Sequence, residues 1–228
     1  MPTEKIRIFP LGDSALTVEF GRAVSTLLNQ NAIGLSEYLE QNPFPGFIES
    51  VPAYASATIF YDLVAVRRGF PEFTSAFETV KSLAEKAINN LNGSQAVIAK
   101  TVEIPVHFDK DSALDLEYVA EMCCLSPKQV IDIFTSATYR VFMLGFLPGF
   151  TYMGEVDGRI ATPRKQSPRL AVPKGSVGIT GKQTGIYSLD SPGGWQIIGR
   201  TDVEMFTPDA ELPTYLRPGD QVRFVAVK

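Results

Sequence analysis

The sequence predicts an α+β protein in which a small α+β layer precedes a β-barrel. Up to Leu91, segments rich in aromatic and β-branched residues alternate with two stretches of helical apolar spacing. Beyond Ala137 the helical periodicity disappears, and short apolar strands with glycine at their ends remain. Many such strands favour a closed or nearly closed barrel, because closure removes exposed strand edges.

The composition is that of an ordinary globular protein that can bury a core. The 228 residues are 45% apolar and 20% charged, and the formal net charge is −4. An acidic chain offers no general attraction to nucleic acid or to an acidic membrane surface. No apolar run approaches the roughly 20 residues that span a bilayer, and the N-terminus lacks a signal-peptide segment. We therefore expect a cytoplasmic protein that binds neither nucleic acid nor a membrane.

The N-terminal part of the chain is predicted to contain four strands and two helices. Apolar residues at helical spacing favour a first helix from Val24 to the stop at Asn42-Pro43. A second helix is predicted from Pro71, which suits a first helical position, to Leu91. The predicted strands comprise residues 5–9, 15–20, 47–51 and 54–61. Two helices on a small sheet make an α+β layer with no apparent reactive site.

A domain boundary is predicted at the sequence Asn92-Gly93-Ser94, which is typical of a helix end followed by a linker. It divides the chain into an N-terminal domain, residues 1–93, and a barrel domain, residues 94–228. The predicted strands of the barrel domain comprise residues 96–108, 141–146, 176–180, 185–189, 195–201, 203–206 and 221–227.

Two short helices are expected near the start of the barrel domain. Ser112 and Asp115 form one capping-box pattern, and Ser126 and Gln129 form another, with Pro127 in the first turn. A helix-turn-helix of this kind can bind DNA. Packing is the favoured role here, because the chain is acidic and the second helix offers few basic residues.

The residue types that most often carry catalysis or bind metals are scarce. His107 is the only histidine, and a lone histidine in a strand is more often structural than a general base. Cys123 and Cys124 are adjacent, so they rarely bridge to each other, and two cysteines alone make no metal site. No GxxxxGK[ST] loop for ATP phosphates is present. We expect no metal site in this chain.

A proline-stiffened loop, residues 162–175, carries the first group of candidate binding residues. Prolines recur every five residues, so Arg164 and Arg169 occupy matching points. Guanidinium groups suit carboxylate or phosphate, because their fork donates two parallel hydrogen bonds. The alternative is a rigid solvated loop whose charges serve solubility.

A second group lies between Gln183 and Gln196. The sequence Ser191-Pro192-Gly193-Gly194 can present backbone N–H groups to an oxyanion beside Trp195. The alternative is two hairpin turns with a core tryptophan. The candidates for substrate or anion binding are therefore Arg164, Arg169, Gln183, Ser191, Gly193, Gly194 and Trp195.

A loop of aromatic residues and glycines, residues 145–152, could face a ligand or form an exposed docking patch. We take Phe146, Pro148 and Phe150 as candidates for contact with a partner protein.

Four segments together resemble the family of the 5-oxoprolinase B subunit. These segments are LGDSALTVEFG, LGFLPGFTYMG, ATPRKQSPRLAVPKGSVGI and GKQTGIYSLDSPGGWQIIGRT. The family was formerly labelled allophanate hydrolase subunit 1, and it includes the KipI-type inhibitor of a sporulation sensor histidine kinase. Every candidate residue named above occupies a position that matches the family's motifs. The resemblance assigns no catalytic role to any of them.

The resemblance implies an α+β N-terminal domain followed by a cyclophilin-like β-barrel. It also implies an ATP-dependent hydrolase that converts 5-oxoproline to glutamate, in which the C subunit is a direct partner and the A subunit is a functional one. ATP then acts at the level of the complex, no cofactor is expected on this chain, and the chain alone is expected to be inactive. A related small amide or urea-derived substrate stays open. The alternative function is inhibition of a sensor histidine kinase, with the barrel blocking autophosphorylation.

Overall fold

The chain folds into two compact units. The computed structural model describes residues 5–91 and 100–227, and its internal contacts divide the chain into units 1–98 and 99–228. The boundary predicted at Asn92-Gly93-Ser94 lies outside the described residues.

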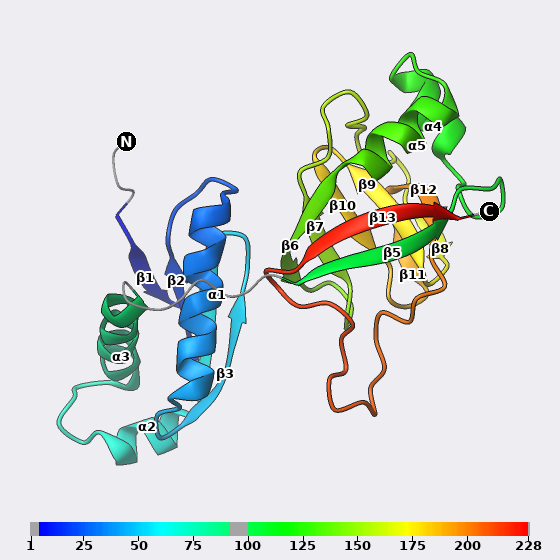
Figure 1. The fold of residues 1–228 in the computed structure, drawn as a ribbon. Coiled ribbons are helices and arrows are strands. Elements are labelled where there is room, and N and C mark those ends of the chain that lie inside the picture. The colour runs from blue at the N-terminus through cyan, green and yellow to red at the C-terminus, as the bar shows by residue number, and fades with distance from the viewer. Residues whose placement is uncertain (1–4, 92–99, 228) are drawn as a thin grey trace. The chain divides into compact units, whose positions relative to one another are not determined.

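The N-terminal unit is built on a four-stranded antiparallel sheet with helices on one face (Figure 1). In sheet order the strands are β1 (Arg7–Pro10), β2 (Ala15–Glu19), β4 (Ser56–Tyr61) and β3 (Phe47–Pro52). Alternate residues of β4, namely Ala57, Ile59 and Tyr61, are buried in the core shared with the helices, as expected when one face of a sheet is covered.

Within residues 5–91, three helices accompany this sheet, whereas two were predicted. The first, α1 (Thr26–Gln41), agrees with the prediction. The short helix α2 (Leu63–Gly69) was not predicted; the Asp62 carboxylate caps it by accepting from the Ala65 N–H at 2.7 Å. Helix α3 (Ala76–Leu91) begins later than Pro71, because Ser75 caps it by accepting from the Glu78 N–H at 3.1 Å.

The second unit is a closed seven-stranded barrel. Going round it, the strands are β10 (Gln183–Ile186), β7 (Thr151–Gly154), β6 (Thr138–Leu144), β13 (Gln221–Val227), β5 (Thr101–His107), β12 (Gln196–Arg200) and β9 (Ser176–Thr180). Strands β9 and β10 pair to complete the circle. The predicted α+β class with a closed barrel is confirmed. The segment 203–206 forms no strand, and only Phe206 makes an isolated bridge, with Thr214.

Helices α4 (Leu116–Met122) and α5 (Pro127–Ser136) pack onto the barrel through Val119, Val130 and Phe134. The Phe134 ring stacks on Phe224 of β13 at 4.8 Å between centroids. The predicted capping box on α5 is confirmed, with Ser126 and Gln129 exchanging hydrogen bonds.

The capping box predicted for Ser112 and Asp115 is wrong. Helix α4 does start after Asp115, but the Asp115 side chain makes no cap hydrogen bond. The Ser112 hydroxyl donates instead to Asp109 at 2.9 Å. Asp115 has other partners, which are described with the candidate site below.

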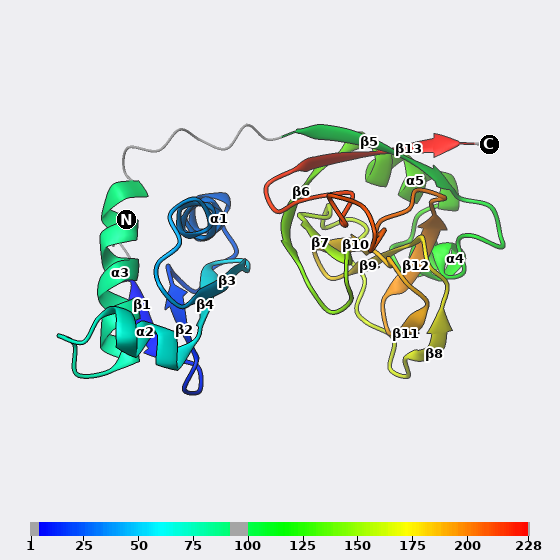
Figure 2. The same ribbon diagram turned by 90° about the horizontal axis from the view of Figure 1, so that it is seen from below.

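A two-stranded ribbon of β8 (Arg169–Val172) and β11 (Ser191–Gly193) accompanies the barrel, and the two strands lie side by side in Figure 2. Between this ribbon and the barrel lies a separate small core whose buried members are Phe150, Val172, Tyr187, Trp195 and Ile197. This small core, called the aromatic cluster below, gathers residues from three of the segments that carry the family resemblance.

We predict that Gly175→Ala destabilises the barrel unit by about 3 kcal/mol, measured as the free energy of unfolding in urea. Gly175 has a φ of +80°, and an added Cβ would overlap the carbonyl oxygen of Thr201. Gly181→Ala is the matched control, since Gly181 also has a positive φ of +52° but faces open space. The control is expected to cost only about 1 kcal/mol. Equal losses in both variants would contradict the predicted overlap.

Candidate functional site

A buried carboxylate fixes the proline-stiffened loop to the barrel. The Asp115 side chain is 5% exposed, and the Arg169 guanidinium binds it with two hydrogen bonds of 2.7 Å. Lys165 Nζ donates to the same carboxylate at 3.1 Å, and the backbone N–H of Ile197 donates to it at 2.7 Å. In return the Asp115 N–H donates to the Ile197 carbonyl at 2.7 Å. Four donor groups from three residues thus converge on one carboxylate.

The protonation of Asp115 reflects this arrangement. Burial alone would raise the pKa of the carboxyl group, because a low-dielectric surrounding disfavours the charged form. The hydrogen bonds from Arg169, the Ile197 backbone and Lys165 outweigh burial and hold the pKa below its ordinary value. Asp115 is therefore an anion at neutral pH, and the ion pair with Arg169 is fully formed.

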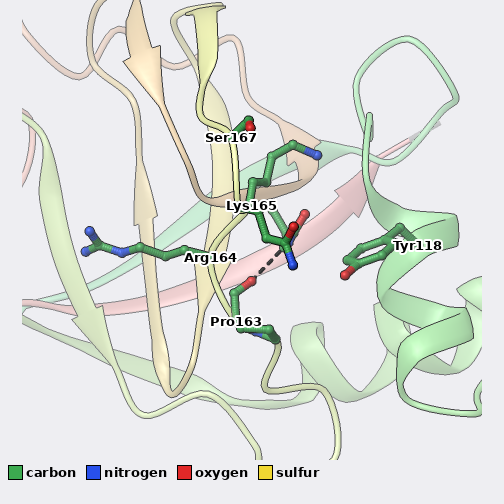
Figure 3. Close-up of a pocket in the computed structure, with 7 residues that line it drawn as sticks. Tyr118, Pro163, Arg164, Lys165 and Ser167 are labelled. Atoms are coloured by element: carbon green, nitrogen blue, oxygen red, sulfur yellow. Dashed lines mark hydrogen bonds between the residues drawn. The ribbon is translucent and has the colours of Figure 1, made fainter.

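The two candidate arginines of the loop differ in what they contact. Arg169 is committed to Asp115, so it acts as a positioning residue for the loop. The exposed Arg164 guanidinium makes no hydrogen bond or ion pair with another described residue. Figure 3 shows the Arg164 side chain extending from one side of the loop, while Tyr118 of α4 lies on the other side. Arg164 is therefore the arginine whose fork is available to a ligand.

The charge of Arg164 acts on the aromatic cluster. Burial raises the pKa of the Tyr187 phenol, and a hydrogen bond with the Trp195 backbone and the charge of Arg164 oppose this effect. The pKa of Tyr152 is also raised by burial, and again the charge of Arg164 opposes the rise. Both phenols are protonated at neutral pH, and Arg164 supplies positive charge beside them.

The rings of the aromatic cluster meet edge to face around Phe150. The Phe150 centroid lies 4.9 Å from Tyr152, 5.1 Å from Tyr187 and 5.5 Å from Trp195, all in T-shaped geometry. Trp195 is 5% exposed, so it belongs to this small core, as the core-tryptophan alternative expected. The cluster provides a rigid apolar support under the loops that carry the candidate polar groups.

Only two of the three candidate docking residues lie at the surface. Phe146 is 59% exposed and Pro148 is exposed, but Phe150 is 1% exposed and supports the loop from beneath. Phe146 also has a φ of +67°, a conformation that a bulky residue rarely adopts. The Phe146 ring lies edge to face against Phe150, with 5.4 Å between the ring centroids. This contact supports the exposed ring of Phe146 from beneath. Phe146 and Pro148 are the members of the three that could contact a partner.

The glycine pair lies against the aromatic cluster. An added Cβ at Gly193 would overlap the Tyr187 hydroxyl, so only glycine permits this approach. The Gly194 carbonyl accepts from the Lys165 N–H at 2.8 Å, which joins the ribbon to the proline-stiffened loop. Ser191 is 8% exposed, and its hydroxyl has no hydrogen-bond partner in the described part of the chain.

Two other residues singled out in the sequence lie elsewhere. Gln183 begins β10, opposite Thr180 and Gly154, at the far end of the strand from Tyr187. His107 ends β5, and its Nε2 lies 3.1 Å from an exposed carboxylate, that of Asp202. Residues 5–91 and 100–227 contain no group of three or more potential ligands that could hold a metal ion, and no helix long and apolar enough to cross a bilayer.

Several residues of this region were not predicted from the sequence. Asp115, Lys165, Tyr152 and Tyr187 carry the ion-pair network and the ring contacts. The two tyrosines lie within the motifs that resemble the family, so a signal for them existed. For Asp115 the local pattern pointed instead to a helix cap.

Comparison with known proteins places the chain in a family. A family model described as the carboxyltransferase domain, subdomain C and D, matches residues 6–216. The 5-oxoprolinase B subunit of Bacillus subtilis (strain 168) is 45% identical over 226 residues, covering 99% of this chain and 94% of that protein. The chain belongs to the family of 5-oxoprolinase B subunits. The family identified from the four sequence segments is thereby confirmed. The 5-oxoprolinase B subunit of Escherichia coli O157:H7 is 37% identical, covering 99% of this chain and 98% of that protein.

Solved structures extend the likeness to longer chains. The crystal structure of TTHA0988 is 37% identical with a TM-score of 0.79, covering 98% of this chain but only 40% of that chain. The urea carboxylase of Kluyveromyces lactis is 20% identical with a TM-score of 0.76, covering 100% of this chain and 23% of that chain. At that identity the second likeness shows the fold alone. In both structures a part that resembles the present chain belongs to a longer chain.

We predict that Asp115→Asn lowers the free energy of unfolding by about 3 kcal/mol at pH 7, because it leaves two partly buried cations, Arg169 and Lys165, without the opposite charge that they pair with. The folded-state pKa of Asp115 is lowered, so its stabilising effect is complete above the unfolded pKa of about 3.9 and fades as pH falls through the lower folded pKa. The stability difference between wild type and variant, measured by urea unfolding, should therefore shrink only below about pH 4.

Asp132→Asn is the control for this experiment. Asp132 also pairs with a lysine, Lys128, but both side chains are more than half exposed. Its loss should change the free energy of unfolding by less than about 1 kcal/mol. A similar small change in Asp115→Asn would show that the Asp115 network contributes little.

Proposed function

We propose that this chain is the B subunit of an ATP-dependent 5-oxoprolinase, and that it contributes part of a site shared with the C subunit. The observation that carries the proposal is the 45% identity, along almost the entire chain, to a 5-oxoprolinase B subunit. The A subunit is the further functional partner in this proposal. A reaction that consumes ATP also makes the cytoplasm the expected location.

The chemistry sets what such a site must provide. One 5-oxoproline, one ATP and two waters yield glutamate, ADP and phosphate, and ATP supplies the driving force for opening a stable lactam. Cleavage develops negative charge on the lactam oxygen, so donors and cations that meet this charge lower the barrier. The substrate carboxylate and the phosphate groups need fixed cationic partners as well.

Arg164 is the group of this chain that best fits these needs. Its guanidinium is exposed, has no partner among the described residues, and extends from a loop held by the Asp115 network. Because the loop backbone is already fixed, binding phosphate or carboxylate needs to order only the Arg164 side chain itself. Arg169 contributes indirectly, since it holds the loop through Asp115.

The alternative function, inhibition of a sensor histidine kinase, stays a prediction. The exposed ring of Phe146 suits contact with another protein. It does not favour a kinase over the C subunit, since either partner could use the same surface.

The proposal is tested by 5-oxoproline-dependent ATP hydrolysis with the purified A, B and C subunits of the same host. We expect turnover only when all three are present, and none with this chain alone. Equal turnover when this chain is omitted, with folded partners, would refute the proposed role. Full inhibition of a host kinase without any 5-oxoprolinase activity would favour the alternative.

Arg164→Ala is predicted to lower kcat/KM of the reconstituted complex by about tenfold or more, because a charged hydrogen bond to the reacting groups is lost. The melting temperature of the chain should stay unchanged, since Arg164 has no partner among the described residues. Arg159→Ala is the control: Arg159 is an exposed arginine of the same unit, and among the described residues it pairs only with its neighbour Asp157. Wild-type kcat/KM in Arg164→Ala would remove this arginine from the mechanism.

A further inference from the structure

A pocket of about 490 Å³ lies between helix α4 and the proline-stiffened loop. Its volume is in the range of small-molecule sites. Figure 3 shows Tyr118 of α4 facing the loop from one side, whereas the Arg164 side chain extends from the other side. The lining residues are Tyr118, Pro163, Arg164, Lys165, Gln166, Ser167 and Gln196.

One of the lining residues, Gln196, carries a buried polar atom with no partner in the described part of the chain. Gln196 is 1% exposed, and its Nε2 donates to the Pro163 carbonyl at 2.9 Å. A carbonyl only accepts, so this bond fixes which end of the amide is the nitrogen. The other end, Oε1, is buried and has no hydrogen-bond partner in the described part of the chain. A buried acceptor without a donor is costly, so a ligand that brings an N–H here would satisfy it.

The charges around the pocket favour an anionic ligand. Its lining includes Lys165 and no carboxylate; Arg164 also lines it, but the Arg164 side chain extends to the other side of the loop (Figure 3). Lys165 and Arg169 share the single charge of Asp115, so the group retains excess positive charge even without Arg164. A ligand carboxylate near Lys165 would balance this excess.

The N–H that meets Gln196 should belong to a neutral group. An ammonium ion loses much hydration when buried and needs an anionic partner to compensate. The one buried carboxylate nearby, Asp115, already accepts from Arg169, Lys165 and the Ile197 backbone. An amide or lactam N–H carries no such cost, because it is uncharged.

We propose that this pocket binds 5-oxoproline, with the lactam N–H donating to Gln196 Oε1 and the carboxylate beside Lys165. The proposal rests on the proposed 5-oxoprolinase function and deepens it, since it names the side of the loop where the substrate lies. Arg164, on the other side of the loop, is then left for phosphate or for a group held by the partner subunit. The product glutamate, with an ammonium group in place of the lactam N–H, binds less tightly.

The test is calorimetric titration of the full chain with 5-oxoproline. Gln196→Met keeps the side-chain length but removes the buried acceptor, and with it the Nε2 donor to the Pro163 carbonyl, so the affinity for 5-oxoproline should fall about tenfold or more. Gln221→Met is the control, because Gln221 also lies on a barrel strand but does not line the pocket. Its affinity should equal that of wild type.

A second arm keeps the protein unchanged and varies the ligand. The carbocyclic analogue of 5-oxoproline, with CH₂ in place of the ring N–H, should bind the wild type about tenfold more weakly. L-glutamate should also bind more weakly than 5-oxoproline. This arm gives an answer even when Gln196→Met fails to fold.

The outcomes separate this inference from the proposed function. The proposed site is supported when 5-oxoproline binds saturably and binding weakens on loss of either the lactam N–H or the Gln196 acceptor. Equal binding of the lactam and its carbocyclic analogue, or no saturable binding at millimolar concentrations, overturns it. The requirement for this chain in ATP hydrolysis by the three-component mixture is measured separately, so the function can stand when the pocket fails.

Discussion

The ion pair between Asp115 and Arg169 is the interaction on which the candidate site depends. Asp115 precedes helix α4, Arg169 begins strand β8, and Ile197 belongs to the barrel strand β12. The Asp115 carboxylate accepts hydrogen bonds from Arg169 and from the Ile197 backbone, so helix, ribbon and barrel share one fixed point. A buried charge without partners is strongly unfavourable, so removing either partner of this pair is expected to be costly.

With that fixed point in place, the proline-stiffened loop separates two chemical environments. One side carries the Arg164 guanidinium. Its positive charge opposes the rise in pKa that burial causes at Tyr187, a member of the aromatic cluster, and at Tyr152, which packs against the cluster. The other side faces Tyr118 (Figure 3), and the pocket there is also lined by Gln196, whose buried Oε1 has no partner in the described part of the chain. A loop held rigidly by prolines and by Asp115 can keep both sets of groups in place before any ligand or partner arrives, and such preorganisation lowers the cost of binding.

The sequence predicted the parts of this protein that local patterns control. The barrel and the α5 capping box follow from strand periodicity and helix-capping chemistry. The role of Asp115 could not be predicted in this way, because Ser112 and Asp115 match a capping pattern, while the true partners lie 50, 54 and 82 residues away. Phe146 and Phe150 are alike in sequence, yet one is exposed and the other is buried, and the packing of the aromatic cluster decides which. Gln196 gains its unsatisfied oxygen from the same long-range packing.

The most direct test of this account is a double-mutant cycle between Asp115 and Arg169. The free energy of unfolding would be measured for Asp115→Ala, Arg169→Ala and the double variant. If the ion pair is the fixed point, the double variant loses far less stability than the two single losses added together, with a coupling energy of about 2 kcal/mol or more. Losses that add within about 0.5 kcal/mol would show that the two residues act independently and would contradict the account.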